Sequence, residues 1–465
     1  MVSVKNFFIN LSVEKIFVII ALFFGLMYSL ILPPFQSVDE TTHFFRAYQI
    51  TEGHFLATQK DGQTGDYLPK AISTYYEKYI PLIKNVDKKV SLAELKDDLK
   101  ISVNKKETKF VSFPNTALYS PVCYISHLPG IILGKLLTPK IAVQFYLGRL
   151  SNLFIYCLLV FFAIRIIPLY KLSLMVIALM PMSLSLAGAY SSDVIVYGLN
   201  FLWLAFIMKI ITQKETLHIF KTFIILLLLA FLLSISKSYF LLIPLCFIIP
   251  INKFKTFKNY IIIMLSVLIS AIIGLMLWSS FIKGISINMN PGIANPMEQI
   301  SYIISHPVNY AIIIVKTFFI KLPRLIITMI GVLGWQDTKL DFITYILYSL
   351  IIYISAVLDN CDFEFLKWQK YIILMTVILG IIITFTSLYI MWSPVTNNII
   401  LGLNGKYFIP IILPALLLFK NCNCKYDINK IKPILIIMLI LILFSSELSL
   451  LHRFYDITPQ LYYKI

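Results

Sequence analysis

Long uninterrupted apolar runs constrain this chain more than any other feature of its sequence. Residues 17–32 read FVIIALFFGLMYSLIL, and residues 260–278 read YIIIMLSVLISAIIGLMLW. A helix needs about 20 such residues to cross a hydrocarbon core roughly 30 Å thick, and neither run has the polar stripe of a soluble amphipathic helix. Only 14% of the residues are charged, whereas soluble domains carry about 25%. The sequence therefore predicts an all-α integral membrane protein and excludes a soluble globular domain.

Eleven segments are apolar enough to be interpreted as membrane-spanning helices. They are residues 16–34, 148–165, 172–190, 194–211, 217–235, 239–252, 259–282, 342–358, 371–392, 407–419 and 433–446. Two of them, 239–252 and 407–419, are short, so the expected bundle holds about 11 transmembrane helices. We expect a single membrane domain over residues 1–465, since the sequence contains no internal repeat.

The distribution of lysine and arginine predicts which ends of these helices face the cytoplasm. With the N-terminus inside, the inner segments are 1–15, 165–171, 209–221, 253–258, 359–370 and 420–432. They hold 16 Lys or Arg residues against 6 Asp or Glu, whereas residues 38–109 hold 12 against 11. Short basic loops stay on the cytoplasmic side, so we expect a cytoplasmic N-terminus. The same rule explains the net charge of +17 without a nucleic-acid partner.

Two further apolar stretches are expected to lie in the outer interface, or to re-enter, without crossing. Residues 118–138 are interrupted by prolines and a glycine, and residues 306–335 contain Pro323 and three cations. Proline breaks and amphipathic charge are typical of re-entrant or interfacial helices. If both stretches crossed, several lysine-rich loops would move to the outer face and violate the charge rule.

Residues 34–142 form a large first outer loop. Within it, residues 91–100 begin with a capping box made by Ser91 and Glu94, which predicts a short helix. Residues 100–113 alternate polar and apolar side chains around Asn104, which predicts a small hairpin. This loop could contact an acceptor or could be a solvated cover, and the sequence leaves both interpretations open.

The most distinctive motif lies where the first span meets this loop, in residues 32–53, LPPFQSVDETTHFFRAYQITEG. The prolines end the span, and a new helix is expected directly after Asp39. Asp39, His43 and Arg46 then share one face, at positions i, i+4 and i+7. We therefore take Asp39, Glu40 and His43 as candidate catalytic residues and Arg46 as a binding residue. The alternative is that Asp39 only caps the helix, while neighbouring aromatic residues anchor it at the interface.

Further candidate binding residues lie at the expected outer ends of other segments. They are Asp193, Lys237, Arg324, Lys406 and Tyr407. Asp193, in GAYSSDVIVYG, would place a second carboxylate at the depth of Asp39, although it could equally cap a helix. The cations could hold a lipid phosphate. Each could also reach the interface along apolar surface without any such function.

At these residues the chain resembles a bacterial membrane protein family catalogued as a domain of unknown function. PPFQSVDETTHFFRAYQ resembles its signature, and YSPVCYISHLPG, LGRLSNLF, LMPMSLSLAGAYSSDVIVYGLNFL, SKSYFLLIPL, GVLGWQDT and NGKYFIPIILP follow in order. That family is similar to the GT-C superfamily of polyprenyl-phosphate-sugar-dependent glycosyltransferases. In GT-C enzymes an acid that opens the first outer loop serves the acceptor or a metal, and Asp39, with Glu40 beside it, matches this position. Asp193 resembles the second acid, which often lies in the next outer loop.

The resemblance implies a GT-C-like bundle and an inverting glycosyltransferase at the outer face of a bacterial cytoplasmic (inner) membrane. The expected donor is a sugar on undecaprenyl phosphate, and the expected acceptor is a cell-envelope glycan or a lipid-linked polymer. Asp39 would take the proton of the acceptor hydroxyl. Lys237, Arg324 and Lys406 would hold the lipid phosphate that leaves.

Three alternatives stay open at this stage. A divalent cation, Mg²⁺ or Mn²⁺, could lie between Asp39, Glu40 and Asp193. A flippase-type transporter or polysaccharide polymerase would also be polytopic and basic, but a transporter should carry its polar residues at mid-membrane. A non-catalytic subunit that binds lipid-linked sugar would need the same residues as the enzyme.

Overall fold

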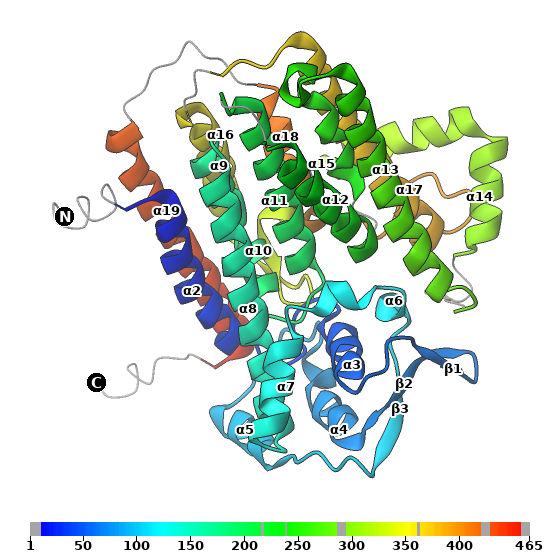
Figure 1. Ribbon diagram of the computed structural model, residues 1–465. Helices are drawn as coiled ribbons and strands as arrows, with labels where there is room; N and C mark the ends of the chain where they lie inside the picture. Colours follow the sequence, from blue (N-terminus) through cyan, green and yellow to red (C-terminus); the bar gives the residue numbers. More distant parts are fainter. Residues whose placement is uncertain are drawn as a thin grey trace.

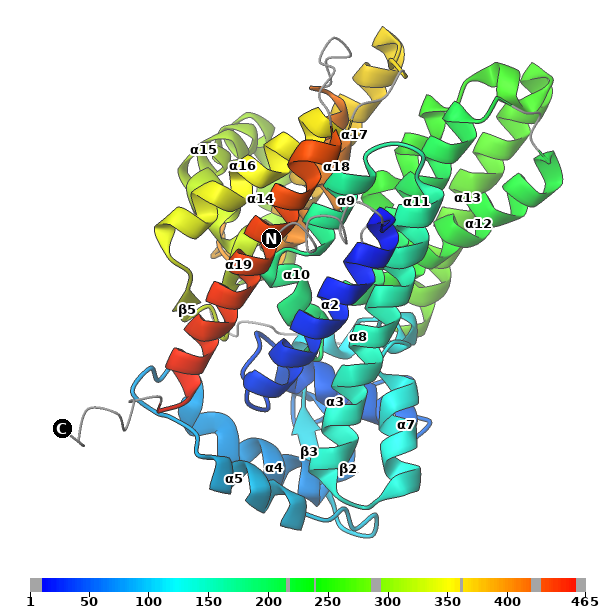
Figure 2. The ribbon, with the colours of Figure 1, turned by 90° about the vertical axis from the view of Figure 1, so that its left-hand side faces the viewer.

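The computed structural model describes residues 11–214, 218–237, 240–285, 294–359, 363–419 and 428–456. Most of its regular structure is helical. Long apolar helices form a bundle, and a smaller lobe of short helices and strands covers one end of it (Figures 1 and 2). The expected helical membrane class is thereby confirmed.

Seven of the described helices are long and apolar enough to cross a membrane. They are α2 (Val13–Ile31), α8 (Ile141–Ile166), α11 (Asp193–Thr212), α12 (Ile219–Ser236), α13 (Phe257–Phe281), α17 (Lys367–Trp392) and α19 (Ile428–Phe454). Each of them coincides with an expected span. Their outer faces expose large apolar side chains, such as Phe23, Phe154 and Met276, which lipid accommodates because its tails are as apolar as leucine.

The other four expected spans are short or irregular. Residues 172–190 are divided into α9 (Lys171–Ala178) and α10 (Pro181–Ala187), because a proline forces the residue before it out of the helical conformation. Residues 239–252 form the 3-10 helices η4 (Phe240–Ile248) and η5 (Ile251–Phe254), and residues 407–419 fall in η6 (Gly405–Phe408) and α18 (Ile409–Leu417). The fourth, α16 (Phe342–Leu358), has 17 residues. The total of eleven spans therefore stays a prediction.

The lobe corresponds to the region that was expected to form the first outer loop. Its helices are α3 (Glu40–Thr51), α4 (Lys70–Tyr79), η1 (Ile80–Leu82), α5 (Leu92–Asp97), η2 (Asp98–Lys100), α6 (Pro114–Ala117), η3 (Pro121–Tyr124) and α7 (Leu128–Leu137). The strands β1 (Thr58–Lys60), β2 (Gln63–Pro69) and β3 (Thr108–Ser112) form an antiparallel sheet in the order β1-β2-β3. The capping box of Ser91 and Glu94 is confirmed.

The hairpin expected around Asn104 is wrong. β3 pairs with β2 instead, and Val111 of β3 is buried in that position. The chain before Asn104 pairs elsewhere, since Val103 N–H donates to Pro139 O at 2.8 Å and Ile141 N–H donates to Ile101 O at 3.1 Å. Distant partners therefore override the local alternation of polar and apolar residues.

The two stretches expected at the interface differ in structure. Residues 118–138 contain only η3 and α7, and α7, with 10 residues, is about 15 Å long and too short to cross. Residues 306–335 contain α15 (Pro307–Gly331), which continues through Pro323, followed by β4 (Val332–Leu333), which pairs with β5 (Thr338–Lys339). α14 (Pro296–Ser305) precedes α15. The expected break at Pro323 is therefore absent.

The last helix ends against the lobe. Val90 N–H donates to Phe454 O at 2.8 Å, and the Arg453 guanidinium donates to the carbonyls of Leu82 and Lys88 at 3.0 and 3.4 Å. The C-terminal end of α2 also leads into the lobe (Figure 2). The end of α19 thus lies on the same side as the first loop, which an odd number of crossings requires.

We expect two exposed lysines to report this topology when they are replaced by cysteine in a background whose six native cysteines are serine. Lys105 lies in the lobe and Lys258 lies in the first turn of α13. A membrane-impermeant maleimide should label Lys105→Cys in intact cells. It should label Lys258→Cys only after permeabilisation, because short basic loops stay inside. Labelling of both in intact cells would contradict the predicted orientation.

Candidate functional site

The site is built on the turn between α2 and α3. Phe35 and Asp39 both have a left-handed backbone, with φ of 64° and 60°. Non-glycine residues keep this conformation only where the surrounding structure holds them. Here Trp335 Nε1 donates to the Phe35 carbonyl at 2.8 Å, and Gln36 Nε2 donates to Tyr79 O at 3.1 Å. The turn is therefore fixed from outside, by the β4–β5 connection and by α4.

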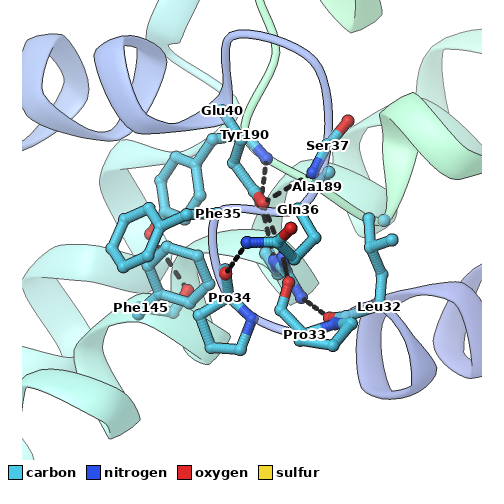
Figure 3. Close-up of polar contacts among 12 residues, drawn as sticks. Leu32, Pro33, Pro34, Phe35, Gln36, Ser37, Glu40, Phe145, Ala189 and Tyr190 are labelled. Atoms are coloured by element: carbon cyan, nitrogen blue, oxygen red, sulfur yellow. Dashed lines mark hydrogen bonds and ion pairs between the residues drawn. The ribbon is translucent and has the colours of Figure 1, made fainter. Parts of the chain in front are cut away.

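A buried ion pair also holds this turn. Neither Glu40 of α3 nor Arg149 of α8 exposes any of its side chain. Nε and Nη2 of Arg149 donate to the two Glu40 oxygens at 2.8 and 2.7 Å. Its N–H groups also donate to the carbonyls of Ser29, Leu32 and Pro33. Figure 3 shows the Glu40 carboxylate next to the turn, where it also accepts from the backbone N–H groups of Ser37 and Tyr190.

These contacts indicate that Glu40 has a structural role. Both of its oxygens are occupied by Arg149 and by backbone N–H groups, and its side chain does not line the cavity described below. From the sequence, Glu40 was expected to be catalytic, and Arg149 was not singled out. The signal for Arg149 was present, because a cation inside an apolar span needs a buried partner.

A cavity of about 380 Å³ opens beside Asp39, where the lobe meets the bundle. Its polar lining consists mainly of Asp39, His43, Asn115, Thr116, Tyr119, Lys237, Lys406 and Tyr407. Its other walls are largely apolar and come from the C-terminal ends of α12, α13 and α17, with Ile235, Leu275, Trp278, Ile383, Leu388, Met391 and Trp392. Five of the residues expected to form the site are therefore gathered around one space.

Asp39 presents its carboxylate to this cavity. Its side chain makes no capping hydrogen bond to α3, whereas its backbone carbonyl accepts from the Thr42 hydroxyl and the His43 N–H. Within the described part of the chain, Oδ1 accepts a hydrogen bond from Asn115 Nδ2 at 3.3 Å. Asp39 therefore occupies the N-cap position of α3 without capping the helix through its side chain, and it lines the cavity instead.

Asp193 pairs with two lysines beside the same cavity. Asp193 is the first residue of α11, Lys237 follows α12, and Lys406 lies in η6. Lys237 Nζ is 3.0 Å from Oδ1 of Asp193, and Lys406 Nζ is 3.1 Å from Oδ2. Lys237, the most exposed of the three, has 13% of its side chain exposed. Two cations and one carboxylate give this cluster a net charge of +1, and the Asp39 carboxylate lines the same cavity as the two lysines.

Two tyrosines flank the lysines. Lys237 Nζ lies 4.8 Å from the ring centre of Tyr119 and 5.9 Å from that of Tyr407. Lys406 Nζ lies 5.7 Å from the Tyr407 ring centre. Cation–π attraction of this kind orients an ammonium group without neutralising it. The pair of lysines therefore keeps its positive charge toward the cavity.

His43 lies one turn after Asp39 and is buried. Its Nδ1 is 2.9 Å from the Tyr124 hydroxyl. Burial lowers the pKa of His43 well below its ordinary value, and the nearby charges of Lys237 and Lys406 lower it further. His43 is therefore neutral at neutral pH, and it can exchange a hydrogen bond with a bound group but adds no charge.

Comparison with known proteins places the chain in a family. A family model described as "Predicted membrane protein (DUF2142)" matches residues 22–415, a range that contains every residue lining the cavity. The chain belongs to the DUF2142 family of membrane proteins. No curated protein and no solved structure matches it. The expected membership in a membrane family of unknown function is thereby confirmed.

The two arginines expected to bind substrate lie outside the cavity of this DUF2142 protein. Arg46 is buried and donates to the Gln49 side chain and to the carbonyls of Phe55 and Tyr119. It therefore holds Tyr119, which does line the cavity. Arg324 is exposed on α15. The spacing of Arg46 on its helix was correct, but the neighbouring loops enclose its side chain.

The carboxylates do not fit a divalent cation between Asp39, Glu40 and Asp193. The oxygens of Asp193 are paired with lysines, and those of Glu40 are paired with Arg149. Among the described residues that line the cavity, Asp39 is the one carboxylate, whereas Mg²⁺ and Mn²⁺ prefer several oxygen ligands. Across the described residues, no three His, Cys, Asp or Glu side chains are gathered into a metal-binding group.

Several neutral residues of the cavity were not predicted from the sequence. They include Asn115, Thr116 and Tyr119 of the lobe and the hydroxyl residues Ser234, Ser236, Ser279, Thr384 and Ser387. None of them carries a charge, and each lies near the end of a helix where polar residues are common. Their position at one end of the bundle was the sole available signal, and it is too weak to select them.

We expect Glu40→Gln to destabilise the protein strongly and Asp39→Asn to leave its stability nearly unchanged. Glu40→Gln leaves the buried Arg149 without a counter-charge, which typically costs about 3–5 kcal/mol. Asp39→Asn removes a partly exposed carboxylate that has no capping role. Thermal unfolding of the two purified variants in the same detergent measures the difference. Equal melting temperatures would contradict the structural role assigned to Glu40.

Proposed function

We propose that this protein is an inverting GT-C-like glycosyltransferase that moves a sugar from a polyprenyl-phosphate donor to a cell-envelope glycan or lipid-linked acceptor. The proposal places it in a bacterial cytoplasmic membrane, with the site on the outer face. One observation carries it: a single cavity has a carboxylate on its lobe side, two lysines on its bundle side and apolar helices around the rest. This combination suits a substrate that joins a sugar, a phosphate and a lipid.

The donor phosphate would bind at Lys237 and Lys406. Both side chains line the cavity, and with Asp193 they have a net charge of +1. A polyprenyl-phosphate sugar is a phosphodiester with one negative charge, and the leaving lipid phosphate gains a second. The lysines would therefore bind the phosphate more strongly as the bond breaks, which is the requirement for lowering the barrier.

The lipid chain would lie between α13 and α17. Both helices line the cavity with apolar side chains such as Leu275 and Leu388. Because the two helices are not packed extensively against each other, a hydrocarbon chain would lie between them and extend from the cavity to the surrounding lipid. A transporter would instead be expected to carry its binding groups near mid-membrane, whereas the charged groups here lie where the lobe meets the bundle.

Asp39 would act as the base. The acceptor oxygen attacks the anomeric carbon, its proton passes to the Asp39 carboxylate, and the bond between that carbon and the phosphate oxygen breaks. The electron pair stays on the lipid phosphate. One carboxylate in the cavity supports a single displacement with inversion, since the described residues that line the cavity include no second carboxylate to act as a nucleophile. Neutral His43, one turn away, would hold the acceptor by a hydrogen bond.

We expect Asp39→Asn to reduce sugar transfer by at least about 10²-fold, the usual contribution of a general base. Asparagine has nearly the same shape but accepts no proton. The measurement is the surface-glycan profile of a deletion strain complemented with wild type or with Asp39→Asn at matched expression. Asn115→Ala is a control that removes the hydrogen bond to Asp39 and should cost less. An unchanged profile with Asp39→Asn would exclude this base.

We expect Lys237→Met to weaken the binding of undecaprenyl phosphate, because it removes one of two cations from the phosphate site. The double variant Lys237→Met/Asp193→Asn serves as a matched comparison. In it Lys406 alone gives the cluster the net charge of +1 that Lys237, Lys406 and Asp193 have together in the wild type. If Lys237 only neutralises Asp193, the double variant should recover both stability and affinity. If Lys237 binds the phosphate, stability should recover while affinity stays low. Titration of the purified variants with undecaprenyl phosphate separates the two outcomes.

A further inference from the structure

A second cavity lies at the opposite end of the bundle. It has a volume of about 650 Å³ and is lined by Phe247, Ile249, Pro250, Ile251, Tyr260, Leu366, Trp368 and Ile372. These residues come from the end of η4, from η5 and from the first turns of α13 and α17. The first cavity is lined by the last turns of α13 and α17. We call the second cavity the apolar groove.

A short crossing segment creates the apolar groove. η4 has 9 residues and, at about 2.0 Å per residue, is about 18 Å long. α13 and α17 have 25 and 26 residues and are about 38 Å long. η4 packs against both helices, and Gln369 Nε2 of α17 donates to Ile248 O at 2.7 Å. Because η4 ends before its two neighbours, a recess is left between their first turns.

The rim of the apolar groove is positively charged. Lys255 and Lys258 lie between Ile251 and Tyr260, and Lys367 and Lys370 lie beside and two residues after Trp368. Lys253 is also near Ile251, but its Nζ donates to the Gln213 carbonyl. Residues 249–260 contain no acidic residue, and the exposed Glu364 is the one acidic residue in 363–372. Lysine in a first helical turn is unfavourable, because the helix dipole is positive there, yet α13 and α17 both carry it. An anion at this rim would relieve the repulsion of both helices.

We propose that the apolar groove binds an anionic phospholipid of the leaflet on the side opposite the lobe. One acyl chain would fill the recess, whose lining is hydrocarbon and aromatic. The phosphate would lie among the lysines, and Trp368 and Tyr260 would lie at the level of the head groups, where such rings are common. A free anion would leave the recess empty, and an unfilled recess loses van der Waals contacts. One phospholipid would therefore fill the recess with an acyl chain and place its phosphate near the lysines.

Native mass spectrometry of the full chain in detergent tests this site, with phosphatidylglycerol and phosphatidylcholine as probes. The groove variant is Lys258→Gln/Lys367→Gln/Lys370→Gln. The matched control, Lys209→Gln/Lys214→Gln/Lys221→Gln, removes the same charge from exposed positions at the same end of the bundle. We expect the groove variant to bind phosphatidylglycerol at least about tenfold more weakly, since each lysine contributes to attraction of an anionic lipid. The control should bind like wild type.

Three results would overturn the proposal. Equal loss in both triple variants would assign the effect to the general basic character of this end. Soluble glycerol phosphate that binds as tightly as the lipid would show that no acyl chain is held. Unchanged phosphatidylglycerol binding in Ile372→Trp, which fills the groove, would place the chain elsewhere. Thermal unfolding confirms that each variant is folded, and none of these measurements depends on sugar transfer.

Discussion

The ion pair between Glu40 and Arg149 is the interaction on which the site depends. Moving two charges out of water costs several kcal/mol for each ion, and an incomplete set of partners would not offset that cost. Here the guanidinium makes five hydrogen bonds, and the carboxylate also accepts from two backbone N–H groups. The pair thereby joins the end of α2, the start of α3, α8 and the chain before α11. The ion pair thereby fixes the turn after Pro33 and Pro34, which positions Asp39.

Asp39 and Glu40 are neighbours in sequence with opposite environments, and this contrast limits what the sequence could predict about the site. Asp39, His43, Lys237 and Lys406 were all expected at the outer ends of their segments. The structure places these four residues around one cavity. The motif could not separate Asp39 from Glu40, since adjacent residues on a helix point about 100° apart and the partner of Glu40 lies in another span. Only the tertiary structure shows that one carboxylate is saturated and the other is available.

The fold was predictable wherever an apolar run was long, and less so where it was short. Seven runs gave helices of the expected kind, because backbone groups in lipid must pair within their own helix. Pro181 divided a run that composition alone made continuous, while Pro323 did not break α15. The two prolines differ in their surroundings: Pro181 starts α10 in the buried centre, whereas Pro323 is exposed on its helix. Such tertiary differences are not encoded in local patterns.

The short 3-10 helix η4 extends from the first cavity toward the apolar groove. A 3-10 helix pairs its backbone less well than an α-helix, and in a membrane its carbonyls need partners from other helices. Trp203 Nε1 of α11 donates to Leu242 O, and Gln369 Nε2 of α17 donates to Ile248 O, both at 2.7 Å. These contacts hold a segment that is shorter than α13 and α17. Its start follows Lys237 at the first cavity, and its early end leaves the recess between α13 and α17.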